Sequence, residues 1–348
     1  MSKFKEDQYL KEGDLIIADA SEDYEDIGKA IEVKNINNER VLAGLHTILA
    51  RDEKNITING FKAYLFLTED LKTNIKRIAN GISVLGISKN NLSKLSVNIP
   101  NKNEQEKIVD FFSAIDKKIE LLEDKYAYYQ YFKKYLMQQI FAQKLRFEDD
   151  DGNHYKNWEE LHLKDIISLK GGYAFKSELF KDEGMPIIRI SNISPDNSVI
   201  LDDLVYYDKL NNDSDFIIKK GELIIAMSGA TTGKVAVYGL QHDSYINQRV
   251  GLFKKTSSKL YYPFLVQYTL SDSFKRELQK TLVAGAQPNI SKKEIESFSI
   301  NLPEYEEQKK LADLLSNLDL KINAIKNQNS EIKMFKRSLL QQMFVCNI

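Results

Sequence analysis

The chain has 348 residues, about the length of two domains, and its 43% hydrophobic content supplies a sizeable core, which excludes wholesale disorder. Its 49 Lys and Arg against 50 Asp and Glu leave a net charge of −1, so no global positive field steers nucleic acid to it. One cysteine, Cys346, excludes a disulfide framework and a cysteine-rich zinc site. No apolar run has transmembrane length and no signal-peptide pattern is present, so we expect a cytoplasmic protein.

The first 86 residues repeat part of a later segment. Lys11–Ala18 corresponds to Lys220–Ala226, with a glycine at the same place in both. The helix predicted at Gly60–Asn80 corresponds to one predicted at Tyr262–Leu282. This pattern predicts two related domains.

The first of these domains is shortened at its start. Trp158 precedes Gly221 by 63 positions, whereas Met1 precedes the equivalent Gly13 by 12. About fifty residues of the second domain therefore have no counterpart in the first.

The next segment, residues 87–142, is duplicated at 290–345 without a gap. The two copies share 20 identities in 56 positions, where chance would produce about 3 or 4. The first copy predicts a short strand at Leu95–Ile99, then a proline, then a helix from Glu104 to about Arg146. Glu148–Asp151 and the following glycine are expected to end that helix.

Both helices keep a seven-residue apolar rhythm, which favours a coiled coil over an ordinary surface helix. Because the two seams match, we expect the helices to pair with each other; the alternative is that each packs on its own domain. Lys133 and Lys336 interrupt the seam at equivalent points, and Asn329 is a further polar interruption. The seam positions are Ile108, Ile115, Leu122, Leu136, Leu311, Leu318, Ile325, Ile332 and Leu339.

Residues 151–289 predict a mixed α/β domain. Its charge is segregated: residues 219–289 hold 10 basic and 4 acidic residues, interleaved with tyrosines. Such a surplus can neutralise phosphates, although a solvated lysine-rich surface is an equal alternative. The predicted strands are Ile166–Leu169, Pro186–Ile190, Gly221–Met227, Val235–Tyr238 and Arg249–Phe253.

We find no catalytic or metal-binding motif. Gly229–Lys234 has three residues between its glycines rather than four and Val235 after the lysine, so it predicts a turn between strands rather than a P-loop. The four histidines are scattered, and no Ser occupies a nucleophile elbow.

The order of these features resembles the specificity (S) subunits of type I restriction-modification enzymes. The segments that carry the resemblance are Leu145–Phe147, Trp158–Glu159, Gly172–Ser177, Ile188–Ile193, Lys220–Leu223, Ser228–Gly233 and Gln287–Ser291, with Ala20–Lys29 as a variant in the first domain. The resemblance covers essentially the whole chain.

The resemblance implies an α+β protein with two target-recognition domains, the first incomplete, separated by two long helices that pair as an antiparallel intramolecular coiled coil. It divides the chain into a partial first recognition domain (1–86), a strand and long helix (87–150), a second recognition domain (151–289) and a second strand and helix (290–348).

The resemblance also implies a non-catalytic subunit that reads a bipartite site in double-stranded DNA and docks two modification subunits and restriction subunits. S-adenosylmethionine, ATP and Mg are expected on those partners, which methylate adenine and cleave DNA, and no cofactor on this chain. The alternative is a coiled-coil structural protein without DNA contact, which would form parallel oligomers.

Polar side chains on the recognition-domain loops are the candidates for contacts with base edges and phosphates. For each one, a role in forming the turn is the competing interpretation. The candidates are Lys176, Ser177, Arg189, Ser191, Asn192, Ser228, Thr231, Thr232, Lys234, Gln248, Arg249, Ser21, Tyr24 and Lys29.

Overall fold

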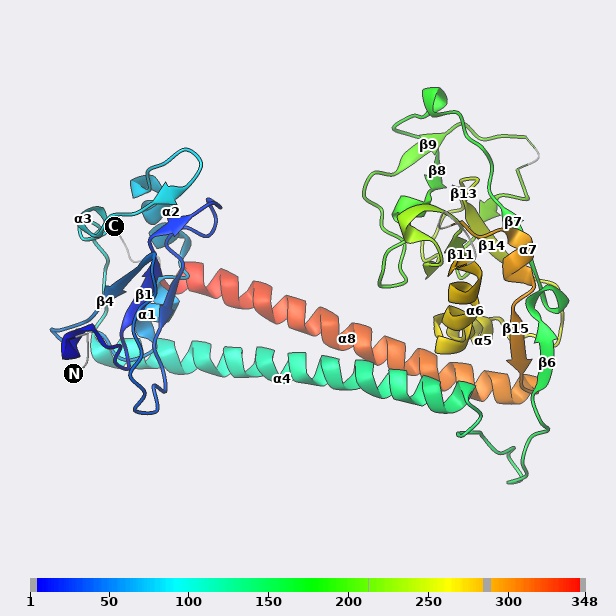
Figure 1. Cartoon of the computed structure of the whole chain (residues 1–348), viewed down its shortest axis with the longest axis horizontal. Coiled ribbons are helices and arrows are strands. Elements are labelled where there is room, and N and C mark those ends of the chain that lie inside the picture. The colour runs from blue at the N-terminus through cyan, green and yellow to red at the C-terminus, as the bar shows by residue number, and fades with distance from the viewer. Residues whose placement is uncertain (1–4, 212, 284–288, 345–348) are drawn as a thin grey trace. The chain divides into compact units, whose positions relative to one another are not determined.

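The computed structural model describes residues 5–211, 213–283 and 289–344. The chain divides into two compact units, residues 1–127 with 323–348 (the first unit) and residues 128–322 (the second unit). Each unit contains part of each long helix, α4 (Lys102–Phe141) and α8 (Tyr305–Phe344) (Figure 1). Gln287 and Pro288 of one family-like segment lie outside the described residues.

The first unit contains a three-stranded antiparallel sheet, ordered β3-β1-β4. Leu15 and Ile17 are buried toward the helices, while Ile31, on the opposite face, is 64% exposed. This sheet is therefore covered on one face. Its elements are β1 (Leu15–Ala18), β2 (Ala20–Ser21), β3 (Ala30–Glu32), β4 (Thr47–Ala50), α1 (Phe61–Leu65), α2 (Glu69–Ile78), β5 (Leu85–Gly86) and α3 (Lys89–Leu92).

The second unit contains two four-stranded sheets, β12-β11-β14-β7 and β10-β13-β8-β9. Its elements are β6 (Glu159–His162), β7 (Ile167–Gly171), β8 (Met185–Ile188), β9 (Val205–Tyr207), β10 (Ile217–Ile218), β11 (Leu223–Ala226), β12 (Val235–Val237), β13 (Ser244–Ile246), β14 (Val250–Lys255), α5 (Tyr262–Leu270), α6 (Asp272–Val283), α7 (Lys292–Glu296) and β15 (Ser299–Leu302).

The β11 sheet is buried on both faces. Ile224 and Leu252 pack toward the other sheet, whereas Leu223, Ile225 and Phe253 pack toward the helices. All four residues of β11 are buried, which explains why its sequence reads as a continuous apolar run rather than an alternating one.

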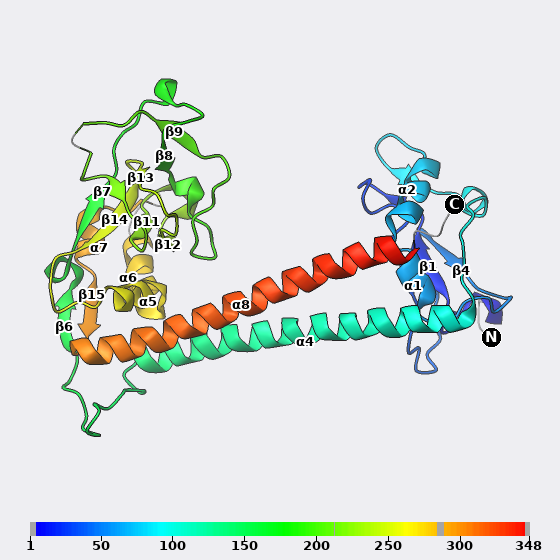
Figure 2. The ribbon, with the colours of Figure 1, turned by 180° about the vertical axis from the view of Figure 1, so that it is seen from behind.

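The two long helices pair within each unit, and they run in opposite directions (Figures 1 and 2). In the first unit, Asp116 of α4 binds Lys336 of α8, and Glu123, further along α4, binds Lys333, which lies earlier in α8. The two helices are therefore antiparallel. In the second unit, the end of α4 packs against the start of α8 around Ile140 and Leu311. The predicted antiparallel intramolecular coiled coil is confirmed within each unit.

Burial along the coil follows the heptad positions. Leu136, Leu318, Ile332 and Leu339 are half-buried, and the other five predicted seam residues are buried. The seam residues that are buried at 9% exposure or less are Ile108, Ile115, Leu122, Leu311 and Ile325.

The two lysines that interrupt the seam form equivalent ion pairs across it. Lys133 Nζ lies 2.6 Å from Asp319, and Lys336 Nζ lies 2.5 Å from Asp116. Lys133 and Lys336 are matching positions of the duplicated sequence, as are Asp116 and Asp319. The coil therefore has an internal two-fold repetition in which each copy supplies one lysine and one aspartate.

A buried glutamine at the start of each long helix binds the backbone of the segment that precedes the first helix of its unit. Gln105 Nε2 donates to the carbonyls of Ile56 and Pro100, and its Oε1 accepts from the N–H of Ile58 (2.9 Å). Gln308 makes the same three contacts in the second unit. Because these amides satisfy backbone groups that would otherwise be left without partners, they couple the helices to the domains.

The strand predicted at Leu95–Ile99 is not formed, whereas its counterpart β15 is. In the second unit, β15 pairs with β6, which belongs to the stretch that has no counterpart in the first unit. Two equivalent sequences differ in structure because only one of them has a strand to pair with.

Three predicted helices end or break earlier than expected. The one predicted at Gly60–Asn80 is two helices, α1 and α2, because Thr68 between them is extended. Helix α4 ends at Phe141 rather than near Arg146, because Gln143 adopts a left-handed conformation (φ 56°) and the Lys144 N–H donates to the Gln139 carbonyl (2.9 Å). The helix predicted at Tyr262–Leu282 is two helices, α5 and α6, because Ser271 is extended and its hydroxyl caps the second one.

We predict that Lys133→Ala lowers the free energy of unfolding by about 1 kcal/mol, because it leaves Asp319 on the seam without its cation. The exchanged pair Lys133→Asp with Asp319→Lys should recover most of that loss. Urea unfolding measures both, with the exposed neighbour Lys134→Ala as the control. Equal effects of Lys133→Ala and Lys134→Ala would contradict a role of the pair in the coil.

Candidate nucleic-acid interface

The ends of several strands in the second unit meet at the link between β13 and β14. The Tyr173 N–H, just beyond β7, donates to the Ile246 carbonyl (3.0 Å), and the Asn247 N–H donates to the Ile188 carbonyl at the end of β8 (2.9 Å). The Met227 N–H, just beyond β11, donates to the Arg249 carbonyl in the same way (2.9 Å). We call residues 172–173, 188–189, 227–228 and 247–249 the strand-end cluster.

Gly172 makes this close approach possible. A Cβ atom at Gly172 would lie 2.2 Å from the carbonyl oxygens of both Ile246 and Asn247. Any side chain at this position would push the end of β7 away from the link, which explains why a glycine precedes Tyr173.

Among the candidate residues, Arg249 and Gln248 are the exposed side chains of the strand-end cluster. Arg249 Nη1 lies 3.3 Å from Ser228 Oγ, which is buried. Ser228 thus orients the guanidinium, whose other donors are available in the geometry suited to a guanine edge or a phosphate.

Arg189 precedes the short 3-10 helix η4 (Ile190–Asn192) and Asn192 ends it, and both side chains bind backbone groups of the same loop. Asn192 is 1% exposed; its Oδ1 accepts from the Arg189 N–H, and its Nδ2 donates to the carbonyls of Ile200 and Asp202. Arg189 Nη2 donates to the Asp203 carbonyl (2.5 Å). These two residues therefore hold the shape of the loop, while Ser191 between them is exposed.

Gly229–Lys234 forms a turn between β11 and β12, as the failed P-loop spacing predicts. Thr231 and Lys234 are half-buried in it, and the Thr232 hydroxyl donates to the Gly229 carbonyl (2.7 Å). Gly233 has φ 85°, and a Cβ there would lie 2.1 Å from Leu278. The turn is built against α6, which limits how far its side chains can reach.

Lys176 and Ser177 are exposed at the start of η3 (Ser177–Leu179) and follow Tyr173 along the same loop. Phe175, which lies between Tyr173 and Lys176, packs against Tyr207 and Tyr245 and so anchors the loop to the second sheet. Burial raises the pKa of Tyr245, whose hydroxyl donates to Asp213 and accepts from the Leu210 N–H.

The remaining candidates, Ser21, Tyr24 and Lys29, belong to the first unit. Ser21 Oγ accepts from the Asp23 N–H (3.0 Å), and the exposed Tyr24 ring lies beneath the Lys76 ammonium. The hydrogen bond to Asp26 raises the pKa of Lys29, which keeps its amine charged. The segment is a compact turn that exposes an aromatic ring and the Lys29 ammonium, and Lys76 of α2 packs against the ring.

Sequence reasoning missed three residues of this surface. Tyr173 is 45% exposed and its ring stacks on Phe216 (5.0 Å); Asn247 pairs with it; Asn289 pairs with Ser228. Tyr173 and Asn289 lie in segments that carry the family resemblance, but the pairings of all three residues are made only by the meeting of strands from different parts of the chain.

The described residues contain no group of three or more His, Cys, Asp or Glu that could hold a metal ion. No helix among them is long and apolar enough to cross a membrane.

Comparisons with known proteins agree with this architecture. A family model, the type I restriction modification DNA specificity domain, matches residues 1–130 and 155–334. The chain is 24% identical over 314 residues to the type I restriction enzyme MjaVIII specificity subunit of Methanocaldococcus jannaschii, covering 87% of this chain and 73% of that protein.

Solved structures share the fold. The S subunit of a type I restriction-modification system from M. genitalium superposes with a TM-score of 0.63 at 16% identity, over 98% of this chain and 86% of that one. The HsdS subunit from Thermoanaerobacter tengcongensis superposes with a TM-score of 0.51 at 18% identity, over 98% and 82%. This chain belongs to the family of type I restriction-modification DNA specificity proteins, which are DNA-recognition components, and the resemblance seen in the sequence is confirmed.

We predict that Asn192→Ala lowers the free energy of unfolding by about 2 kcal/mol, because it removes the three hydrogen bonds that this buried side chain makes to the backbone of Arg189, Ile200 and Asp202. Ser191→Ala, at the exposed neighbouring position, should change it by less than about 0.5 kcal/mol. Thermal unfolding compares the two variants; similar melting temperatures would contradict the structural role of Asn192.

Proposed function

We propose that this chain is the non-catalytic subunit that selects the DNA sequence in a type I restriction-modification complex. The second unit reads one half of a bipartite site in double-stranded DNA through Tyr173, Gln248 and Arg249 of the strand-end cluster and the adjoining Lys176 and Ser177. The first unit reads the other half through the turn that carries Ser21, Tyr24 and Lys29.

The observation that carries this proposal is the two-fold repetition of the coil. The ion pairs Lys133–Asp319 and Asp116–Lys336 are equivalent, as are the glutamine anchors Gln105 and Gln308. A chain that repeats its framework twice while varying the attached sheet is suited to reading two different half-sites from one scaffold.

The same repetition supports the docking of two identical modification subunits. Tyr131 and Met334 occupy equivalent helix positions and are 72% and 66% exposed. Exposed apolar side chains at repeated positions offer the same contact twice. The modification subunits would hold S-adenosylmethionine and methylate adenine, and restriction subunits would supply ATP- and Mg-dependent cleavage.

The central test reconstitutes the chain with a type I modification subunit and maps adenine methylation on genomic DNA. Arg249→Ala should lower methylation at the preferred site about tenfold or relax one base position, because a bidentate arginine contact contributes about 1–3 kcal/mol of discrimination. Lys259→Ala is the matched control, since Lys259 is exposed in the same unit but pairs with Glu159. Methylation that does not require this chain, or equal losses in both variants, would refute the assignment.

A second test changes the length of the coil. One heptad inserted after Ala127 in α4 and one after Ile322 in α8 keeps the seam in register and lengthens the pair by about 10 Å. The preferred gap between half-sites should grow by about 3 base pairs at 3.4 Å per pair. An insertion in α4 alone should abolish methylation because it misaligns the seam. An unchanged gap in the double insertion would contradict the role of the coil as a spacer.

A further inference from the structure

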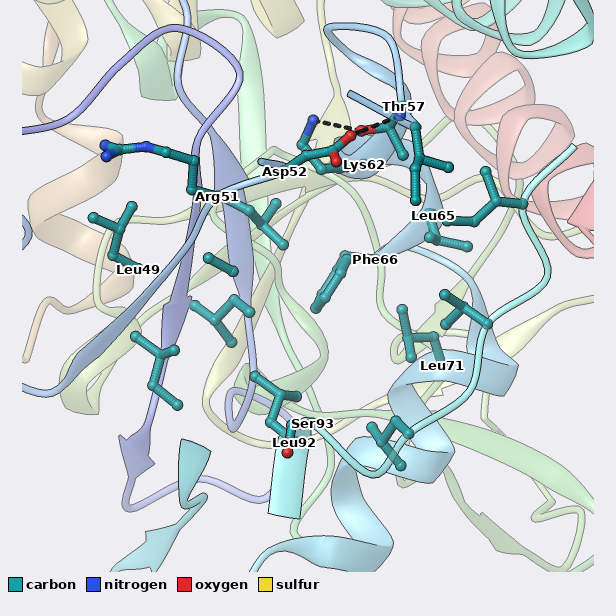
Figure 3. Close-up of a pocket in the computed structure, with 18 of the residues that line it drawn as sticks. Leu49, Arg51, Asp52, Thr57, Lys62, Leu65, Phe66, Leu71, Leu92 and Ser93 are labelled. Carbon is teal, nitrogen blue, oxygen red and sulfur yellow. Dashed lines mark hydrogen bonds between the residues drawn. The ribbon is translucent and has the colours of Figure 1, made fainter. Parts of the chain in front are cut away.

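The first unit contains an apolar groove of about 450 Å3 (Figure 3). One wall is formed by β1 and β4, and Phe66 and Leu71 of the helical segment line another. The segment that fails to form a strand, residues 95–99, lines the groove with Leu95, Val97 and Ile99. Val97 and Ile99 are 41% and 36% exposed there.

The same place in the second unit is filled. Ile300 and Leu302, the equivalents of Val97 and Ile99, are only 1% and 4% exposed. β6 pairs with their strand, and Leu163 and Leu169, from the segment that begins with β6, belong to the same buried cluster. The stretch that fills the second unit is the one without a counterpart in the first.

Two strand edges of the first unit lack the neighbours that their equivalents have. In the second unit, β14 pairs with β7 on one side and with β11 on the other. Its counterpart β4 pairs with β1, and no described strand pairs with its outer edge. Residues 96–99, the counterpart of β15, likewise have no partner strand among the described residues.

An equivalent glutamate near the start of each long helix indicates what else belongs to this segment. Glu307 is fully buried; Arg146 Nη2 lies 2.8 Å from its Oε2, and the Trp158 Nε1–H donates to the same oxygen (3.1 Å). Glu104 is the identical residue in the first copy, and it is exposed. It therefore offers a carboxylate where the second unit binds an arginine and a tryptophan.

We propose that the groove of the first unit binds in trans a segment of a second polypeptide, different from this chain, with the chemistry of residues 146–171. An arginine and a tryptophan of that segment bind Glu104. A first strand pairs with residues 96–99, a second adds to the outer edge of β4, and the leucines and isoleucines between them fill the groove. This is strand addition of the kind by which exposed sheet edges capture extended peptides. Binding of this segment completes the recognition sheet and does not depend on what the sheet reads.

The test adds a labelled synthetic peptide with the sequence of residues 146–171 to the full chain and follows fluorescence anisotropy. We expect saturable binding and slowed amide exchange at residues 47–50 and 96–99, because both edges gain hydrogen bonds. A peptide with Leu163 and Leu169 replaced by Ser should bind at least tenfold more weakly. No saturable binding, or equal binding of the two peptides, would overturn the proposal.

Variants of the chain locate the binding site. Val97→Asp places a charge in the groove at a part-exposed position, so the chain should still fold while binding falls at least tenfold. Glu104→Gln should weaken binding a few-fold. Ile82→Asp, at a fully exposed apolar position of the same unit that does not line the groove, should leave it unchanged.

Binding that survives Val97→Asp would place the peptide elsewhere and overturn the proposal. Concentration-dependent dimers that Val97→Asp abolishes would assign the groove to a second copy of this chain and overturn it as well. Because no DNA or modification subunit is present, either result leaves the proposed function untouched.

Discussion

The antiparallel pairing of two copies of one helical sequence is the constraint on which the rest of the structure depends. Each copy carries a lysine inside its apolar seam and an aspartate 17 positions before it. In a parallel, in-register pair the lysines would face each other, and like charges at one level of a coil are unfavourable. Running the copies in opposite directions brings Lys133 to Asp319 and Lys336 to Asp116, so both charges are paired. The duplicated sequence and the positions of its charged residues together favour the antiparallel orientation of the two helices.

The recognition sheets are attached to this coil by contacts that the duplication also repeats. Tyr64 binds Asp116 in one unit, and Gln267 binds Asp319 in the other. The ring of Phe61 packs against Phe344 at 5.6 Å, and Phe141 packs against Phe264 at 5.7 Å. These contacts join the long helices to α1 in the first unit and to α5 in the second. They do not involve the ends of the strands, which can therefore differ between the units. A frame that is repeated, with strand ends that differ between the two units, allows the surface of each sheet to change without changing how the frame assembles.

The two units differ where the chain does not repeat. The second sheet of the second unit, its strand β7 and its strand β6 all depend on residues 159–207. Without that stretch, the first unit keeps one open sheet face, an open strand edge and an apolar groove. These three features share one cause, because residues of a single segment cover the equivalent places in the second unit. The asymmetry concentrates the candidate base-reading side chains in the second unit.

The sequence by itself determined the duplication, the two long helices, the seam and the family, because heptad rhythm and repeat identity are local or directly countable. It also indicated most strands of the second unit. Tertiary structure decided the rest. Whether Leu95–Ile99 forms a strand depended on a partner strand distant in sequence, and whether Asn192 faces solvent depended on carbonyls of a loop that folds back on it. The composition of the strand-end cluster was likewise decided by hydrogen bonds between segments up to about eighty residues apart, which no pattern within a single segment records.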